Sequence, residues 1–194
     1  HGKTSFEMNW KAKAKPEGNK IIQKARQDGR HALLEHEAKN LFEIHGAPVP
    51  QDCLVQSADE AVQCAHDLGT DVAMKIVSPD ILHKSDAKGV RLNLKGKGDV
   101  EKAYARMMKD AKRFKPEADI RGVLMSPMVE PGVEVIIGTK IDDQFGPIIM
   151  YGLGGVMVEI LKDISFRVLP ISRLSAKTMI KETKSAPILE GIRG

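Results

Sequence analysis

The order of strand and helix patterns is the feature that most restricts how this chain can fold. Between residues 53 and 128, apolar residues recur with the periods of a strand, a helix, two strands, a second helix and another strand. Farther along, strand patterns dominate and are separated by Pro-Gly, Asp-Asp and glycine-rich turns. Two successive strands without a helix between them do not fit the strict alternation of a doubly wound sheet. The sequence therefore predicts an α+β fold.

The boundaries of these elements follow from the hydrophobic periods and from start and stop residues. Helices are expected over residues 31–45, 57–69, 99–114 and 175–184. Strands are expected over residues 53–56, 72–77, 90–94, 121–128, 134–141, 147–151, 156–161 and 166–169. Ser57 and Glu60 form a capping-box pattern, and Asp99 is expected to cap the third helix.

Composition and length indicate a soluble chain with room for a hydrophobic core. The 194 residues are 42% hydrophobic, and the longest uncharged run, residues 144–158, is too short and too rich in Gly for a membrane span. Cys53 and Cys64 form no Cys-x-x-Cys pair, so the sequence supports neither a disulfide framework nor a zinc site. Because no apolar leader is visible either, we expect a cytoplasmic protein in a reducing compartment, with no membrane partner.

The net charge of +4 comes from the N-terminal segment. Residues 1–30 contain eight basic and three acidic residues, whereas the rest of the chain contains 22 basic and 23 acidic residues. This segment is interpreted as a solvated basic tail, and residues 1–7, which precede Met8, as an added segment. Because the remainder is nearly neutral and lacks a basic stripe with interleaved aromatic residues, no nucleic-acid partner is expected.

The segment that follows the strand expected at residues 72–77 carries most of the reactive side chains. Lys75 lies within that strand, and either it points toward an anion such as phosphate or the alternation places it on a solvated face. His83 follows in the loop, beside Lys84 and Ser85. A neutral imidazole can attack a phosphoryl group whose oxygens contact a lysine and loop N–H groups. The alternative for His83 is an exposed loop histidine without a catalytic role.

Two further segments are candidates for contacts with a nucleotide. Residues 127–134 join a strand end, a turn and a new strand, where main-chain groups can read an adenine edge and a carboxylate can accept from ribose; alternatively, they only form a turn. The glycines in residues 152–155 either let the main chain approach phosphates or only make a sharp turn. They are not a dinucleotide-binding fingerprint, because Met157 occupies the place of the last glycine.

Taken together, these segments resemble the ATP-grasp β subunit of the NDP-forming acyl-CoA synthetases, the ADP-forming acetate–CoA ligase family. The resemblance extends from about Leu34 to Gly194, and its most specific part is the run His-Lys-Ser-Asp-x-x-Gly-Val at residues 83–90. Supporting motifs are Gly46-x-Pro48-x-Pro50, Glu130-Pro131-Gly132-x-Glu134, Phe145-Gly146-Pro147, Gly152-x-Gly154-Gly155 and Glu159-x-x-Lys162-Asp163-x-x-Phe166-Arg167-x-x-Pro170.

The resemblance implies an ATP-grasp fold, in which two α+β lobes clamp a nucleotide. The first lobe would cover residues 31–128 and the second residues 129–194. The implied activity is phosphoryl transfer between a histidine and ADP or ATP, within the reaction acyl-CoA + ADP + phosphate = acid + CoA + ATP. Mg²⁺ is implied as a cofactor. The implied partner is a CoA-binding α subunit or fused CoA-binding domains, which predicts a hetero-oligomer.

The resemblance also assigns roles to individual residues. His83 would be the phosphoryl carrier. The residues assigned to the nucleotide or to the transferring phosphoryl group are Lys75, Lys84, Ser85, Gly89, Met128, Val129, Glu130 and Glu134. Among these, Lys75 would bind nucleotide phosphate, the main chain of residues 127–130 the adenine, and Glu134 the ribose.

Two departures from the family pattern affect these expectations. Lys88 stands where the family commonly has the first glycine of a pair, which reduces the backbone freedom of the loop. The chain also ends before the segment expected to hold magnesium, so a C-terminal part is expected to be missing and the chain alone to be inactive; Glu159 and Asp163 remain as metal candidates. The alternatives are a non-catalytic, nucleotide-binding regulatory module, as in acetyltransferase fusions, and then a nucleic-acid adaptor that uses the basic tail.

Overall fold

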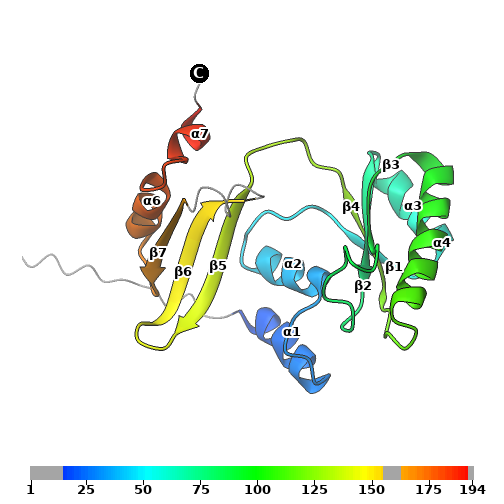
Figure 1. Cartoon of the computed structure of the whole chain (residues 1–194), viewed down its shortest axis with the longest axis horizontal. Helices are drawn as coiled ribbons and strands as arrows, with labels where there is room; N and C mark the ends of the chain where they lie inside the picture. Colours follow the sequence, from blue (N-terminus) through cyan, green and yellow to red (C-terminus); the bar gives the residue numbers. More distant parts are fainter. Residues whose placement is uncertain (1–14, 155–162, 192–194) are drawn as a thin grey trace, which may run out of the picture. The chain divides into compact units, whose positions relative to one another are not determined.

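The computed structural model describes residues 15–154 and 163–191, which fall into two compact units (Figure 1). The first unit extends to Val129 and the second begins at Glu130. Within these ranges, none of the helices combines the length and the apolar character needed to cross a lipid bilayer.

A four-stranded sheet forms the centre of the first unit. Its strands are β1 (Cys53–Val55), β2 (Val72–Val77), β3 (Val90–Leu94) and β4 (Gly122–Pro127), in the spatial order β1-β4-β2-β3. All three neighbouring pairs are antiparallel. Helices α3 (Ala58–Leu68) and α4 (Gly96–Phe114) pack on this sheet (Figure 1). Helices packed on an antiparallel sheet confirm the predicted α+β class.

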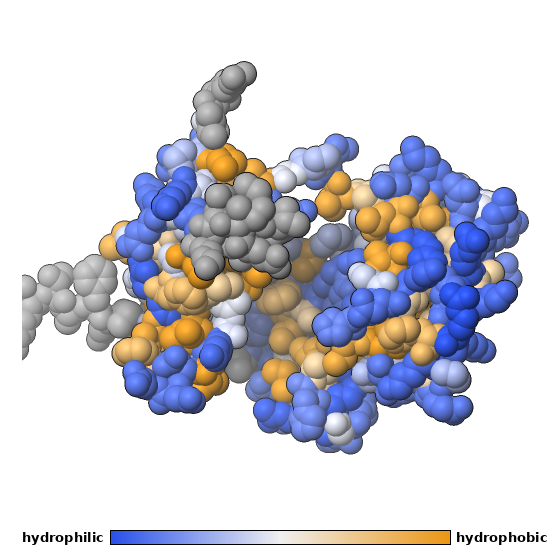
Figure 2. Space-filling model, in the orientation of Figure 1, coloured by the Kyte–Doolittle hydropathy of each residue, from blue (hydrophilic) through white to orange (hydrophobic). Residues whose placement is uncertain are grey.

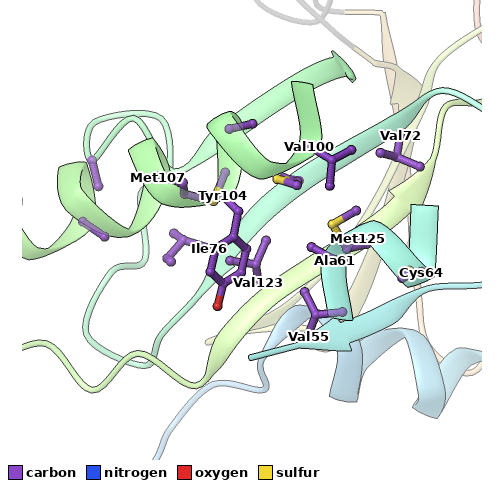
Figure 3. Packing of buried hydrophobic residues seen from close by; sticks show 14 of the residues in the cluster. Val55, Ala61, Cys64, Val72, Ile76, Val100, Tyr104, Met107, Val123 and Met125 are labelled. Carbon is purple, nitrogen blue, oxygen red and sulfur yellow. The ribbon is translucent and has the colours of Figure 1, made fainter. Parts of the chain in front are cut away.

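Alternation along the central strand β2 decides which side chains enter the core. Met74 and Ile76 are fully buried in the cluster that also contains α3 and α4 residues. Tyr104 and Met107 of α4 point into the same cluster (Figure 3). The helical spacing of the apolar residues predicts a buried stripe of Val100, Ala103, Tyr104, Met107, Met108 and Ala111 for this helix, and all of these except Met108 are buried. Because successive side chains of a strand alternate between faces, Lys75 extends from the opposite face of the sheet.

Helix boundaries follow from local capping. The Ser57 hydroxyl accepts a hydrogen bond from the Glu60 amide at 3.1 Å, so α3 begins where the capping pattern predicted. Helix α4 begins earlier than expected, at Gly96 with Lys95 before it. The prediction that Asp99 caps this helix is therefore wrong. Asp99 instead lies in the first helical turn, where a carboxylate interacts favourably with the helix dipole.

Two helices precede the sheet, and sequence analysis missed one of them. Helix α1 (Pro16–Gln27) begins with proline in its first turn, and Gly29, with a φ of 70°, follows its end. Arg30 then donates to both carboxylate oxygens of Glu37 in α2 (Glu35–Ile44), at 2.6 and 2.8 Å. Residues 16–30, predicted to be a solvated basic tail, instead form a helix and an ion pair that hold them on α2.

In its described residues, the second unit is a three-stranded antiparallel sheet with two helices. Its strands are β5 (Val135–Asp142), β6 (Gly146–Leu153) and β7 (Ile164–Val168), in the spatial order β5-β6-β7; its helices are α6 (Arg173–Lys181) and α7 (Ala186–Glu190). The buried Ser165 hydroxyl of β7 donates to the Met179 carbonyl of α6 at 2.8 Å, which ties sheet and helix together. The strand predicted over residues 156–161 lies outside the described residues.

The sheet of the second unit carries many exposed apolar side chains. Ile137, Ile141 and Phe145 are each more than 60% exposed, and Figure 2 shows apolar atoms on the surface of this unit. Most buried apolar residues belong instead to the first unit. Most of the hydrophobic stabilisation of the described chain therefore comes from the first unit.

The structure corrects the prediction that the two cysteines stay unpaired. Cys53 of β1 and Cys64 of α3 form a disulfide, with a Cα–Cα distance of 6.4 Å. Their pairing follows from the strand–turn–helix geometry, because α3 folds back over β1 and both residues lie at inward-facing positions beside the core. The spacing of eleven residues carries no motif, so sequence inspection had no local signal for this bond. The cysteines therefore no longer support the expectation of a reducing compartment.

Candidate functional site

The loop of residues 78–89 presents His83 at its outer end. Ile81 and Ala87 are buried in the core and anchor the two arms of the loop. Asp80 strengthens the first arm, since its carboxylate accepts from the Asp119 amide at 2.7 Å and from the Lys115 ammonium at 3.2 Å. Between the anchors, His83 is exposed. The fold therefore holds the loop at both ends and exposes the histidine between them.

Gly89 closes the loop against β2. Its amide donates to the Lys84 carbonyl at 2.7 Å, and its carbonyl accepts from the Ile76 amide at 2.8 Å. A Cβ at this position would lie 2.4 Å from the Cγ2 of Ile76, so no larger residue fits without movement of the core. Because the Gly89 amide is engaged in loop closure, it is not free to hold a phosphoryl oxygen in this conformation.

Three lysines surround the carboxylate of Glu35, a residue of α2. Its Oε1 accepts from Lys75 at 2.6 Å and lies 3.4 Å from the ammonium of Lys39, while its Oε2 accepts from Lys84 at 3.1 Å. Lys39 also pairs with Asp52 at 2.5 Å. Three ammonium groups thus face two carboxylates, which leaves the cluster with an excess of positive charge. Lys75 therefore points toward an anion, as one of the two alternatives predicted, and that anion is a carboxylate of the chain itself.

The lysines determine the ionisation of Glu35. Burial of its carboxylate raises the pKa, but the hydrogen bonds from Lys75 and Lys84 outweigh burial and lower the pKa from 4.5 to about 2. Glu35 is therefore ionised at neutral pH and holds both lysines in place.

Glu35→Gln is expected to lower the free energy of unfolding by on the order of 2 kcal/mol at pH 7, after allowance for solvent screening. The folded-state pKa lies below the ordinary value, so the stabilisation is complete above pH 4.5 and is lost as the pH falls from 4.5 to about 2. Urea unfolding of both proteins, followed by circular dichroism at pH 7, 4.5 and 2.5, measures the difference. Glu43→Gln, an exposed change on the same helix, is the control. A difference that stays constant down to pH 2.5 would contradict the prediction.

An open pocket of about 390 Å³ collects the predicted phosphoryl-transfer residues. Its lining includes Glu35, Lys75, His83, Lys84 and Ser85. Lys75 reaches it from β2, Glu35 from α2 and the other three from the loop. The main-chain amides of Lys84 and Ser85 have no hydrogen-bond acceptor within the described part of the chain. The pocket therefore combines a histidine and two ammonium groups with the carboxylates of Glu35 and Asp86, and the ammonium groups are donors that suit a phosphoryl group.

The residues predicted to contact adenine and ribose do not line this pocket. The Met128 amide donates to the Asp71 carbonyl at 2.8 Å, so it is already engaged, while Val129 is 66% exposed. Glu130 and Glu134 are exposed and belong to the second unit. Their assignment to the nucleotide stays a prediction.

The two described glycines of the glycine-rich segment allow close packing of main chain. A Cβ on Gly152 would lie 2.8 Å from the Asp163 carbonyl oxygen, and a Cβ on Gly154 would lie 3.0 Å from the Cβ of Glu134. The Gly154 amide also donates to the Glu134 carbonyl at 2.7 Å. Contact with neighbouring strands is therefore sufficient to explain why both positions carry glycine.

Of the two metal candidates, only Asp163 lies among the described residues, and Glu159 lies outside them. The Asp163 carboxylate accepts from the amides of Lys184 and Ser185, both at 2.8 Å. The contacts with Ser185, followed by that with Lys184, lower its pKa. In the described ranges, no group of three or more His, Cys, Asp or Glu side chains could hold a metal ion. In this conformation Asp163 holds the start of α7, and the assignment of Glu159 and Asp163 to a metal stays a prediction.

Glu35 is the site residue that sequence reasoning missed. The helix that carries it was predicted, but the helix contains several acidic residues. Which of them faces β2 depends on tertiary packing, because Glu35 is 40 residues from Lys75 and 49 from Lys84. The available signal was indirect: a lysine within an apolar strand requires a carboxylate or phosphate partner.

This chain is similar to several known proteins. A family model described as ATP-grasp domain matches residues 24–194. The acetate–CoA ligase [ADP-forming] II subunit beta of Pyrococcus furiosus is 49% identical over 180 residues, which cover 93% of this chain and 76% of the relative. A structure of acetyl-coenzyme A synthetase 1 from Ca. Korarchaeum cryptofilum, in complex with coenzyme A, Ca-AMPCP and HgCl+, matches with a TM-score of 0.85 and 46% identity and covers 91% of this chain and 77% of that one.

A second structure of the same synthetase contains coenzyme A and Mg-AMPPCP, and its phosphohistidine segment points towards the nucleotide binding site. It matches with a TM-score of 0.76 and 42% identity, over 91% of this chain and 76% of that chain. The chain thus spans about three quarters of these relatives.

The family match and the fold define an ATP-grasp domain. More narrowly, the chain belongs to the ATP-grasp family of the ADP-forming acetate–CoA ligase β subunits, which confirms the resemblance stated from the motifs.

Proposed function

We propose that this chain is the nucleotide-binding part of an ADP-forming acyl-CoA synthetase and that His83 carries the phosphoryl group. The observation that carries the proposal is the open pocket in which His83 lies with Lys75, Lys84 and Ser85. The overall reaction is acyl-CoA + ADP + phosphate = acid + CoA + ATP. This chain would perform the step between the histidine and the nucleotide.

In the direction of histidine phosphorylation, an imidazole nitrogen of His83 attacks the γ-phosphorus of ATP. The new N–P bond forms as the bond between that phosphorus and the bridging oxygen breaks, so ADP leaves with the electron pair. The ammonium groups of Lys75 and Lys84 offset the negative charge of the phosphoryl oxygens. The reverse sequence transfers the phosphoryl group from His83 to ADP.

Glu35 acts in this scheme as a positioning residue. Each ammonium group has three N–H donors, and Lys75 and Lys84 each use one of them on Glu35. The remaining donors are available to phosphate while the carboxylate keeps both side chains at the pocket. Because Glu35 and Asp86 also line the pocket, its ammonium donors rather than a net charge favour phosphate.

The remaining parts of the nucleotide are assigned by the family resemblance. The main chain at Met128, Val129 and Glu130 would contact adenine, and Glu134 would accept from the ribose hydroxyls. Since the Met128 amide already donates to Asp71, the adenine would use neighbouring main-chain groups. Mg²⁺, which accompanies the nucleotide analogue in a related structure, would neutralise phosphate charge, and Glu159 and Asp163 are the candidates to hold it.

The partner in this proposal is a CoA-binding α subunit or a set of fused CoA-binding domains, which would make the enzyme a hetero-oligomer. The relatives include separate β subunits, which supports such a partner. The acyl group and CoA would bind on that partner, and the assembly would act in the cytoplasm.

Incubation of the full-length protein, including any segment beyond residue 194, with radiolabelled Mg-ATP tests the proposal. The expected product is a protein-bound phosphate that is labile in acid and stable in base, as a phosphohistidine is. Addition of ADP to the labelled protein should return the label to ATP. Saturable binding of Mg-ATP without any transfer would instead support the non-catalytic regulatory module, and a base-labile label would contradict a histidine carrier.

A further inference from the structure

A second pocket, of about 600 Å³, lies between the end of the His83 loop, β3 and α4. Its lining consists of Lys88, Arg91, Arg106, Lys109, Asp110 and Arg113, which are five basic side chains and one carboxylate. This pocket shares no lining residue with the pocket around His83, although the loop of residues 78–89 contributes to both. Neither the family resemblance nor the proposed phosphoryl transfer assigns a role to this basic pocket.

The Arg91–Asp110 ion pair, 2.9 Å long, forms the inner part of the basic pocket. The Arg91 side chain is 24% exposed and that of Asp110 14%. The Arg91 guanidinium also donates to the carbonyls of Lys88 and Val90. These bonds hold the wall of the pocket in place. Because the Asp110 carboxylate pairs mainly with Arg91, it neutralises little of the charge of the other cations.

Three of the four outer cations have no ion-pair partner in the described part of the chain, and the fourth, Arg113, has only a long contact with Asp110. Among the residues that the structure describes, Lys88, Arg106 and Lys109 form no ion pair, and Arg113 is 70% exposed at 3.6 Å from Asp110. Arg106, Lys109 and Arg113 follow each other at helical spacings of three and four residues. Like charges at these spacings repel each other on a helix, and a bound anion would remove that repulsion.

Lys88 adds a second, independent observation. Its φ is 51°, in the left-handed region that glycine adopts without strain and lysine does not. Despite this unfavourable conformation, the chain carries a lysine that brings its charge to the pocket. Backbone strain is often retained at binding sites, and here it lies at a pocket lined mainly by cations.

We infer that the basic pocket binds a small, multiply charged phosphate anion of the diphosphate class. Arginine guanidinium groups match phosphate oxygens in pairs, and lysine adds compact positive charge. The four outer cations of the basic pocket come from the loop and from α4. Together they favour a ligand with several phosphate oxygens over a ligand with one carboxylate. The inference does not depend on the proposed phosphoryl transfer at His83.

Calorimetric titration with inorganic pyrophosphate at physiological salt tests this inference. Arg106→Gln combined with Lys109→Gln is expected to weaken binding at least about tenfold. Lys102→Gln combined with Lys112→Gln removes the same charge from exposed positions of α4 outside the pocket and should leave affinity nearly unchanged. Lys88→Gly should also weaken binding without lowering the melting temperature, because glycine relieves the backbone strain.

Several results would overturn the inference. One is the absence of saturable pyrophosphate binding, and another is an equal loss in both double variants, which would indicate general charge attraction. Tighter binding of a short DNA duplex with the same dependence on Arg106 and Lys109 would identify nucleic acid as the occupant instead. Lys75→Ala should retain the pyrophosphate affinity of this pocket, so failure here and failure of the nucleotide site are distinguishable.

Discussion

His83→Ala is expected to reduce phosphate incorporation from radiolabelled Mg-ATP to the background level of a sample without protein. The other groups of the pocket cannot give the same label: ammonium nitrogens have no free electron pair, a phosphate ester on Ser85 would be stable in acid, and an acyl phosphate on Glu35 or Asp86 would be labile in base. His83 is exposed and takes no side-chain part in the core, so folding stability should change by only about 0.5 kcal/mol or less. Acid-labile, base-stable radiolabel per mole of protein measures the effect.

His66→Ala is the matched control for this experiment. His66 lies on α3 and its side chain is 82% exposed, so its removal also takes one accessible imidazole from the protein. The control should incorporate as much label as the unchanged chain. Label retained in His83→Ala and lost in His66→Ala would place the phosphoryl carrier on α3. Retention in both would show that neither histidine carries the phosphate.

The strands and the core stripe were predictable because they depend on local periodicity. The bounds predicted for β2 and β3 agree with the structure, and most of the predicted α4 stripe is buried. Helix α1 was missed for a reason that the sequence itself could have corrected. Charge counted over residues 1–30 indicated a tail, while Pro16 and Gly29 marked the start and the stop of a helix.

The reactive residues of the site could be predicted from the sequence, but the residue that forms ion pairs with its lysines could not. Lys75, His83 and Lys84 could be singled out because they are close in sequence and chemically distinctive. Glu35 could not, because its contact with Lys75 depends on how α2 lies against the face of β2 that alternation leaves outside the core. The disulfide has the same origin, since it depends on the way α3 folds back over β1.

Lys75→Ala is expected to weaken binding of Mg-ATP by roughly 10- to 100-fold, which corresponds to about 1.5–3 kcal/mol for hydrogen bonds to a charged group. The change removes the ammonium that reaches the pocket from the sheet, and it also leaves Glu35 with two lysines instead of three. The carboxylate then repels the incoming phosphates more strongly, so both consequences lower affinity. Calorimetric titration with Mg-ATP and Mg-ADP measures the loss.

Lys102→Ala is the control for this change, because it removes an equal charge from an exposed position of α4. Circular dichroism of Lys75→Ala checks that the sheet is intact, since Lys75 lies in its central part. If the loss arises at the pocket, Glu35→Gln in the Lys75→Ala background should restore part of the affinity, because the uncompensated carboxylate is removed. Equal affinity in Lys75→Ala and the unchanged chain would place the nucleotide phosphates away from β2 and would separate His83 from its phosphoryl donor.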